Sequence, residues 1–170
     1  MERVSKRNYY LDIAQTVLER ATCLRRVYGA IIVKNDEIIS TGYNGAPRGR
    51  KNCVDLGYCT REQLKVPRGE RYELCRSVPA QANAIISAQR RDMVGASNYL
   101  VGRDARSGQL LHDATSCPMC RRMIINAGPD EVVIRRPEPE FDIVSVPTRL
   151  HQDDSPHPQQ SGHTASLMTI

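Results

Sequence analysis

The amino-acid sequence predicts an α/β sandwich with a mixed β-sheet. Apolar residues recur at helical spacing over residues 8–25 and again later, and short β-branched runs lie between these stretches. The expected elements follow the order helix, strand, strand, helix, strand, helix, strand, which is typical of a sheet covered by helices. The 170 residues have a one-domain length. We expect that domain over residues 1–150 and a flexible tail over 151–170, where Pro, Gln, Ser and His accumulate.

The N-terminal third of the chain predicts one helix and one β-hairpin. The helix, over residues 8–25, would present one apolar face. The runs at 30–34 and 38–41 are apolar or β-branched, and the turn sequence Asn35-Asp36-Glu37 separates them. A Gly/Asn turn over 42–45 ends the second strand. The apolar face of the helix would consist of Tyr10, Ala14, Val17, Leu18 and Ala21.

A long loop is expected over residues 46–78. It carries eight basic side chains and three of the six cysteines. A loop of this length inside a compact domain is usually functional or is pinned by a metal.

Two further helices and two strands follow. Residues 79–94 predict a helix that Gly95 would close, and 98–101 predict a short strand. After a polar loop, residues 118–127 predict a third helix, stopped by Gly128 and the proline behind it. Residues 132–135 predict the last strand.

Composition limits the classes of function. The net charge of +5 and the isoelectric point near 9.0 favour anionic ligands such as nucleotides. Binding of nucleic acid is disfavoured because the basic residues are scattered along the chain. No run is apolar and long enough to span a bilayer, and residues 1–7 lead into no secretory signal, so we expect a cytoplasmic protein without a membrane partner. Six cysteines in such a chain suggest metal sites before disulfides.

Two stretches carry a resemblance to a known family. They are Glu70–Ala84, which contains Val78-Pro79-Ala80-Gln81-Ala82, and the later Ser116-Cys117-Pro118-Met119-Cys120. Together they resemble the zinc-site signature of the deoxycytidylate (dCMP) deaminase family, within the cytidine deaminase superfamily. The resemblance covers residues 8–136 and implies a three-layer α/β/α cytidine-deaminase-like sandwich. It also implies a nucleotide or related small molecule as ligand and a homo-oligomer, a hexamer in this family.

The signature departs from the family at the catalytic centre. By the resemblance, Pro79 stands where the family has a zinc-binding His, and Gln81 stands where it has a proton-shuttling Glu. Proline has no donor atom for a metal, and an amide cannot carry the proton. Proline does suit the first position of a helix, since its φ is preset and it has no N–H to leave unpaired. We therefore expect ordinary hydrolytic deamination to be lost.

The resemblance implies that Cys117 and Cys120 are the two remaining ligands of the catalytic zinc. Ser116, which precedes them, stands where the family has Pro. The alternative is that both cysteines pack as small hydrophobic residues. His112 lies a few residues earlier and could complete a metal site, but we interpret it as an exposed loop histidine.

The other four cysteines lie in segments that resemble those around a second, structural zinc in some family members. Four thiolates would form the closed tetrahedral site typical of structural zinc. The alternative is a set of unrelated buried thiols. The four residues are Cys23, Cys53, Cys59 and Cys75.

Three residues are candidate contacts to the ligand. Residues 41–47, Thr-Gly-Tyr-Asn-Gly-Ala-Pro, are similar to a family stretch whose Asn faces the nucleotide, which makes Asn44 a candidate, although a turn asparagine is the alternative. Arg48 could bind a phosphate, and Tyr99 could line the same pocket as Gln81.

Besides binding of nucleic acid, the sequence leaves three functional hypotheses. The first is a deaminase-like protein that keeps the fold and a nucleotide pocket without hydrolytic deamination, either as a pseudoenzyme or in another reaction. The second is a working zinc-dependent deaminase with a metal site rebuilt through His112. The third is a thiol redox protein that uses Cys117 and Cys120 at a helix N-terminus.

Overall fold

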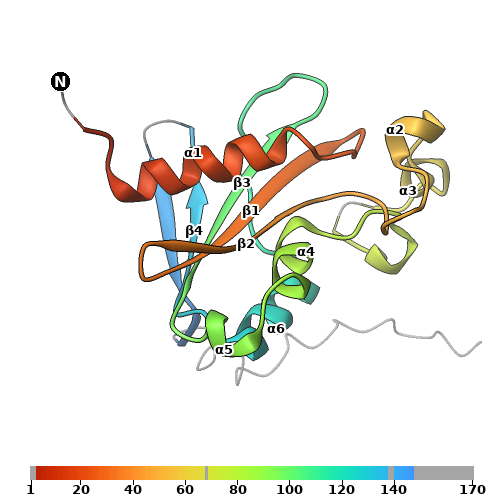
Figure 1. Cartoon of the computed structure of the whole chain (residues 1–170). Helices are drawn as coiled ribbons and strands as arrows, with labels where there is room; N and C mark the ends of the chain where they lie inside the picture. The colour runs from red at the N-terminus through yellow and green to blue at the C-terminus, as the bar shows by residue number, and fades with distance from the viewer. Residues whose placement is uncertain (1–2, 68, 138–139, 148–170) are drawn as a thin grey trace, which may run out of the picture.

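The computed structural model of the chain describes residues 3–67, 69–137 and 140–147. Its centre is a β-sheet that, within these ranges, has five strands in the order β2-β1-β3-β4-β5 (Figure 1). Strands β3 and β4 run parallel, and every other neighbouring pair is antiparallel. The predicted mixed sheet is therefore confirmed. The strands are β1 Arg26–Lys34, β2 Glu37–Tyr43, β3 Ser97–Asp104, β4 Glu131–Arg135 and β5 Phe141–Ser145.

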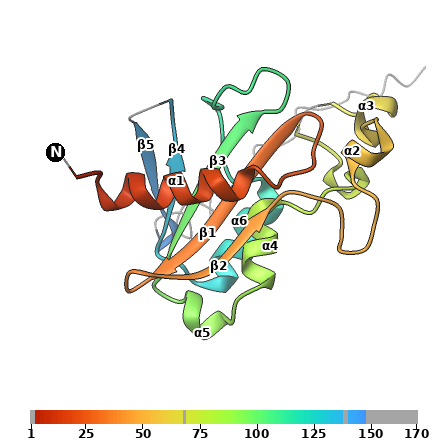
Figure 2. The same ribbon diagram turned by 45° about the horizontal axis from the view of Figure 1, so that its top comes forward.

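Helices cover both faces of the sheet, which confirms the α/β/α layering (Figure 2). Helix α1, Lys6–Leu18, lies on one face and buries Leu11, Ala14 and Leu18 against the strands. Helices α4, Ala80–Ile86, and α6, Pro118–Ala127, lie on the opposite face. Their buried residues pack against the side chains that β1, β3 and β4 turn to that side: Ala30, Ile32, Leu100, Val132 and Ile134.

A glycine in the sheet allows close helix packing on each face. A Cβ added to Gly29 on β1 would lie 2.1 Å from the carbonyl oxygen of Ala14 in α1. A Cβ added to Gly42 on β2 would lie 2.3 Å from the carbonyl oxygen of Ala80 in α4. Any larger residue would push a helix off the sheet. Gly42 therefore fixes the place of the N-terminus of α4, which matters for the site.

The segment over residues 46–78, predicted as a loop, contains short helices. It contains the short helices α2, Cys53–Leu56, and α3, Thr60–Gln63, and a 3₁₀ turn, η1, at Tyr72–Leu74. An isolated β-bridge between Gly45 and Val78 ties its two ends together. The segment thus begins and ends at one place, beside the start of α4.

Several other elements differ from the sequence prediction, among them β1, which begins at Arg26 rather than residue 30. Helix α1 ends at Leu18, not near residue 25, because the chain turns there toward β1. The expected helix over 79–94 is two helices, α4 and α5, Arg90–Met93, separated by residues 87–89. Strand β3 extends to Asp104, and strand β5 was not expected.

Among the described residues, no helix combines the length and apolarity needed to cross a membrane. The expected tail over 151–170 lies outside the described residues.

Candidate functional site

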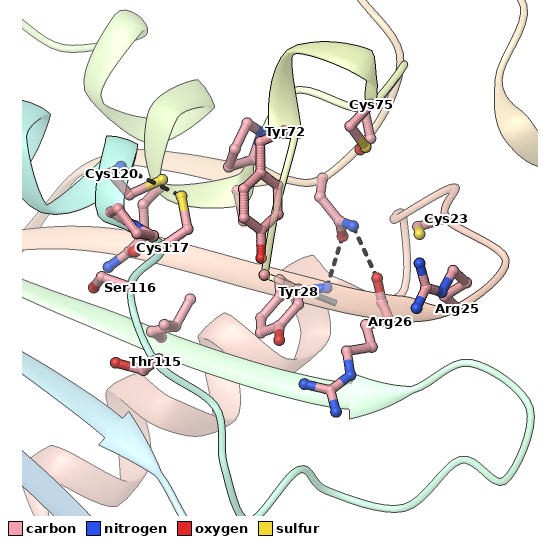
Figure 3. A pocket seen from close by; sticks show the side chains of 18 of the residues that line it. Cys23, Arg25, Arg26, Tyr28, Tyr72, Cys75, Thr115, Ser116, Cys117 and Cys120 are labelled. Carbon is pink, nitrogen blue, oxygen red and sulfur yellow. Dashed lines mark hydrogen bonds between the residues drawn. The ribbon is translucent and has the colours of Figure 1, made fainter. Parts of the chain in front are cut away.

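A cavity of about 380 Å³ lies where α4 and α6 begin (Figure 3). The start of α4 contributes Pro79 and Gln81, and the start of α6 contributes Cys117 and Cys120. The start of β1, the end of β2, Leu100, residues 113–116 and the segment over 46–78 contribute to the rest of the wall. The structure therefore brings together the two stretches that the sequence singled out.

The N-terminus of α6 orients the two cysteines of the CxxC sequence. Cys117 is the N-cap residue, and its Sγ accepts a hydrogen bond from the backbone N–H of Cys120 at 3.3 Å. Pro118 occupies the first turn, as predicted, and Gly128 in the left-handed conformation ends the helix. Cys117 is half-buried at the cavity, whereas Cys120 is 2% exposed.

The two thiols have opposite pKa shifts. A hydrogen bond from the Cys120 side chain, together with backbone N–H groups at the helix start, lowers the pKa of Cys117 to about 6. The same side-chain hydrogen bond and burial raise the pKa of Cys120. The two sulfurs are therefore unequal, and Cys117 ionises more readily than the buried Cys120.

Pro79 and Gln81 have different structural roles at the start of α4: Pro79 caps the helix, and Gln81 bonds to the sheet. Pro79 is the N-cap residue, with φ −62° and ψ 150°, one position before the first helical place that the sequence predicted for it. Gln81 lines the cavity but is 3% exposed, and its Nε2 donates a 2.9 Å hydrogen bond to Oδ1 of Asn98 on β3. The Gln81 amide is thus held by the sheet beneath the helix.

The donor set does not fit a catalytic zinc with three protein ligands. Pro79 offers no donor atom, and Gln81 is an amide bonded to Asn98. His112 is exposed and is not part of the cavity wall. Within residues 3–67, 69–137 and 140–147, no group of three or more His, Cys, Asp or Glu side chains is arranged to hold a metal ion. Cys117 and Cys120 stand as a pair of thiols without a third ligand.

The other four cysteines gather at the opposite end of the cavity. Cys23, Cys59 and Cys75 line it, and Cys53 is buried behind them at the start of α2. Burial, and to a lesser degree the neighbouring thiols, raise the pKa of both Cys53 and Cys75. Thiols suit zinc chemically, but in the described part of the chain no three of these four are arranged to hold a metal ion.

The basic residues of the cavity are not those that the sequence suggested. Arg48 is exposed and does not line the cavity. The cationic side chains in the wall are instead Arg25, Arg26, Arg61 and Arg121. Only one acidic side chain, Asp113, stands in that wall as described, and it pairs with Arg26 at 3.3 Å. The balance of charge favours an anionic ligand.

Arg61 anchors the segment over 46–78 to the cavity wall. The residue is 7% exposed, and its Nη2 donates to the carbonyl oxygens of Pro67 and Glu70 at 3.0 and 2.5 Å. Its guanidinium lies 4.8 Å from the ring centroid of Tyr72, a cation–π contact. Its Nε has no hydrogen-bond partner among the described residues. No sequence signal distinguished this arginine from the others in the same segment.

Asn44 lines the cavity, but its side-chain amide is hydrogen-bonded to the backbone of β1. Its Oδ1 accepts from the backbone N–H of Tyr28 at 2.7 Å, and its Nδ2 donates to the carbonyl of Arg26 at 2.9 Å. These bonds hold the end of β2 against β1. Tyr99 lies on the opposite face of the sheet, where its ring packs 5.3 Å from that of Tyr10, and it is not part of the cavity wall.

The family is established by a match over most of the chain. Residues 4–136 match the family model described as the cytidine and deoxycytidylate deaminase zinc-binding region. The chain belongs to this family. The resemblance inferred from the sequence is thereby confirmed.

Individual relatives agree with the family assignment. The chain is 32% identical over 138 residues to the deoxycytidylate deaminase of Mycobacterium phage D29 and spans 96% of that protein and 78% of its own length. It is 30% identical over 131 residues to the deoxycytidylate deaminase of Schizosaccharomyces pombe, covering 77% of this chain but only 37% of the yeast protein. The fold is similar to that of the dCMP deaminase of cyanophage S-TIM5 in complex with dCMP and dUMP, with a TM-score of 0.52 at 23% identity over 81% of this chain and 85% of the phage chain.

Proposed function

We propose that this protein binds a nucleotide, or a related small anionic molecule, in the cavity between α4 and α6 and does not catalyse its hydrolytic deamination. The observation that carries the proposal is that Pro79 offers no metal donor in the cavity where Cys117 and Cys120 lie. Two thiols do not complete a catalytic zinc centre, and the Gln81 amide cannot cycle a proton between water and base.

The preserved geometry supports binding. The helix starts, the cavity and the CxxC turn are all present. Among the described residues, the cavity wall contains four arginines and one acidic residue, Asp113. A phosphate group would match this charge, because Arg side chains recognise phosphate oxygens through charge-assisted hydrogen bonds. The relative from cyanophage S-TIM5 binds dCMP and dUMP, and we extend a nucleotide ligand to this chain on that basis.

We also propose a structural zinc and a homo-oligomer. The zinc would bind Cys23, Cys53, Cys59 and Cys75, the set of cysteines that the family resemblance implies. Exposed Ile38 and Tyr43 on β2, the edge strand, and Ile86 on the adjacent helix α4 leave apolar surface for a second copy. A hexamer and a cytoplasmic location remain predictions from the resemblance and the sequence.

Isothermal titration calorimetry tests the binding proposal. The ligands are dCMP, dUMP and deoxycytidine, which lacks the phosphate. We expect both nucleotides to bind more tightly than the nucleoside. Arg26→Gln, in the wall, should weaken nucleotide binding about tenfold, the scale of one charge-assisted hydrogen bond.

Arg48→Gln is the matched control, because it removes the same charge outside the cavity wall. It should leave affinity within twofold. If none of the three ligands binds at millimolar concentration, the proposal is wrong. Equal losses for both variants would mean that the net charge of the protein, rather than the cavity, attracts the ligand.

A further inference from the structure

The cysteine pair at the start of α6 is left without a partner by the change at position 79. Cys117 is half-buried at the cavity, and Cys120 lies behind it, almost fully buried. The Cys117 sulfur accepts a hydrogen bond from the backbone N–H of Cys120 at 3.3 Å (Figure 3). The arrangement gives one accessible sulfur and one buried sulfur three residues apart.

We propose that Cys117 and Cys120 form a redox-active dithiol that exchanges with small anionic disulfides entering the cavity. A CxxC turn at a helix N-terminus places its two sulfurs close enough to form a disulfide with each other. The proposal concerns thiol chemistry and does not depend on whether the cavity binds a nucleotide.

A second feature of the same turn points to a ligand. Ser116 is 1% exposed and lines the cavity, and its Oγ has no hydrogen-bond partner within the described ranges. A buried hydroxyl without a partner is costly unless something fills the site. An incoming disulfide with carboxylate groups would accept that hydroxyl hydrogen bond and meet the positive charges of Arg26 and Arg121 in the wall.

The exchange balances in two steps. The Cys117 sulfur attacks one sulfur of the small disulfide, which forms a mixed disulfide and releases one small thiol. The Cys120 sulfur then attacks the Cys117 sulfur, forming the internal disulfide and releasing the second small thiol. The two protons of the cysteines leave with the two released thiols. The protein is oxidised by two electrons, and the small disulfide is reduced by two.

The experiment equilibrates the full chain in glutathione buffers of increasing oxidised fraction. Free thiols are then blocked, and peptides are mapped by mass spectrometry. We expect a Cys117–Cys120 disulfide to form in the wild-type chain and to reverse with dithiothreitol. Oxidised glutathione, which is anionic, should react at least tenfold faster than the cationic disulfide cystamine.

Two variants locate the attacking sulfur. Cys120→Ser should trap glutathione on Cys117, because the second step is removed. Cys117→Ser should leave Cys120 unmodified, because that sulfur is buried. Wild-type mapping needs no variant and remains decisive if either variant fails to fold.

Three outcomes would overturn the proposal. The first is no Cys117–Cys120 disulfide at any oxidised fraction. The second is modification of Cys59 or Cys75 at the same rate as Cys117. The third is a faster reaction with cystamine, which would contradict the anionic substrate class.

Discussion

Nε2 of Gln81 donates a 2.9 Å hydrogen bond to Oδ1 of Asn98, and both side chains are buried. The bond joins the start of α4 to the centre of the sheet, at the position where the family resemblance places the proton-shuttling residue. Nδ2 of Asn98 has no partner among the described residues. A carboxylate at position 81 could therefore accept from Asn98 once that amide turns over.

Asn98→Ala should destabilise the protein, because it leaves the buried amide of Gln81 without its partner. We expect a loss of about 1–3 kcal/mol in the free energy of unfolding, measured by urea denaturation. Gln63→Ala removes an exposed amide on α3 and should change that free energy by less than about 0.5 kcal/mol. If both variants lose the same stability, the buried hydrogen bond contributes nothing measurable.

Zinc content tests the four-cysteine site. The purified chain should hold one zinc per molecule, measured by atomic emission, and Cys53→Ser should lose it and melt at a lower temperature. The physical reason is that Cys53 would join α2 to the thiols at 23, 59 and 75 across a closed site. Cys117→Ser is the control and should retain the metal. A protein without zinc, or a Cys53→Ser variant that keeps it and melts unchanged, would contradict this site.

Tyr10 provides a pH-dependent link between α1 and the hairpin. Its hydroxyl donates to Oδ1 of Asp36 at 2.5 Å, which, with burial, raises the pKa of Tyr10 to about 12. The unfolded chain releases that proton near pH 10, so the stabilisation is complete below pH 10 and is lost as pH rises toward 12.

Spectrophotometric titration at 295 nm should show a late step near pH 12 from Tyr10, with Tyr99, whose pKa burial also raises, as a second delayed tyrosine. Tyr10→Phe should remove that late step and flatten the fall in stability between pH 10 and 12. Tyr58→Phe, at an exposed site, should leave both features in place. A late step that survives in Tyr10→Phe would show that another tyrosine carries it.

Light scattering tests the oligomer. We expect a species several times heavier than the 19.1 kDa chain, because apolar side chains on β2 and α4 remain exposed in the single chain. Ile86→Lys should shift the mass downward, since a charge at an apolar contact is costly to bury. A wild-type protein of 19.1 kDa only would be incompatible with the proposal.

Local signals in the sequence were sufficient for some elements. Helix α6 was predicted with its observed bounds, because Pro118 suits the first turn and Gly128 adopts the left-handed conformation that ends helices. Strand β5 could not be predicted, because Phe141–Ser145 follows a proline-rich stretch and is only half-buried at the sheet edge. The break between α4 and α5 was also missed, since residues 87–89 contain no Gly or Pro.

The candidate site was predictable where sequence motifs define it and not where the fold does. Both helix starts were identified from their motifs. The side of the sheet that Tyr99 faces depends on the strand register, and its neighbour Leu100 lines the cavity instead. The wall arginines, such as Arg61, come from separate segments that only the folded chain brings together.

Introducing, at the start of α4, the two residues that the family resemblance implies there provides the positive control. Pro79→His with Gln81→Glu supplies a third ligand and a carboxylate that Asn98 can meet. The double variant should bind one more zinc than wild type, whereas neither single change should gain activity, because the Glu needs zinc-bound water and the zinc needs its ligand. The gain should therefore be strongly non-additive.

The most direct measurement is ammonia release from dCMP by the unmodified, zinc-supplied chain, with dUMP formation followed by mass spectrometry and the double variant alongside. We expect no turnover above the buffer rate from the unmodified chain. Sustained conversion of dCMP to dUMP by that chain would contradict the account and would point to a metal site completed by a residue other than Pro79.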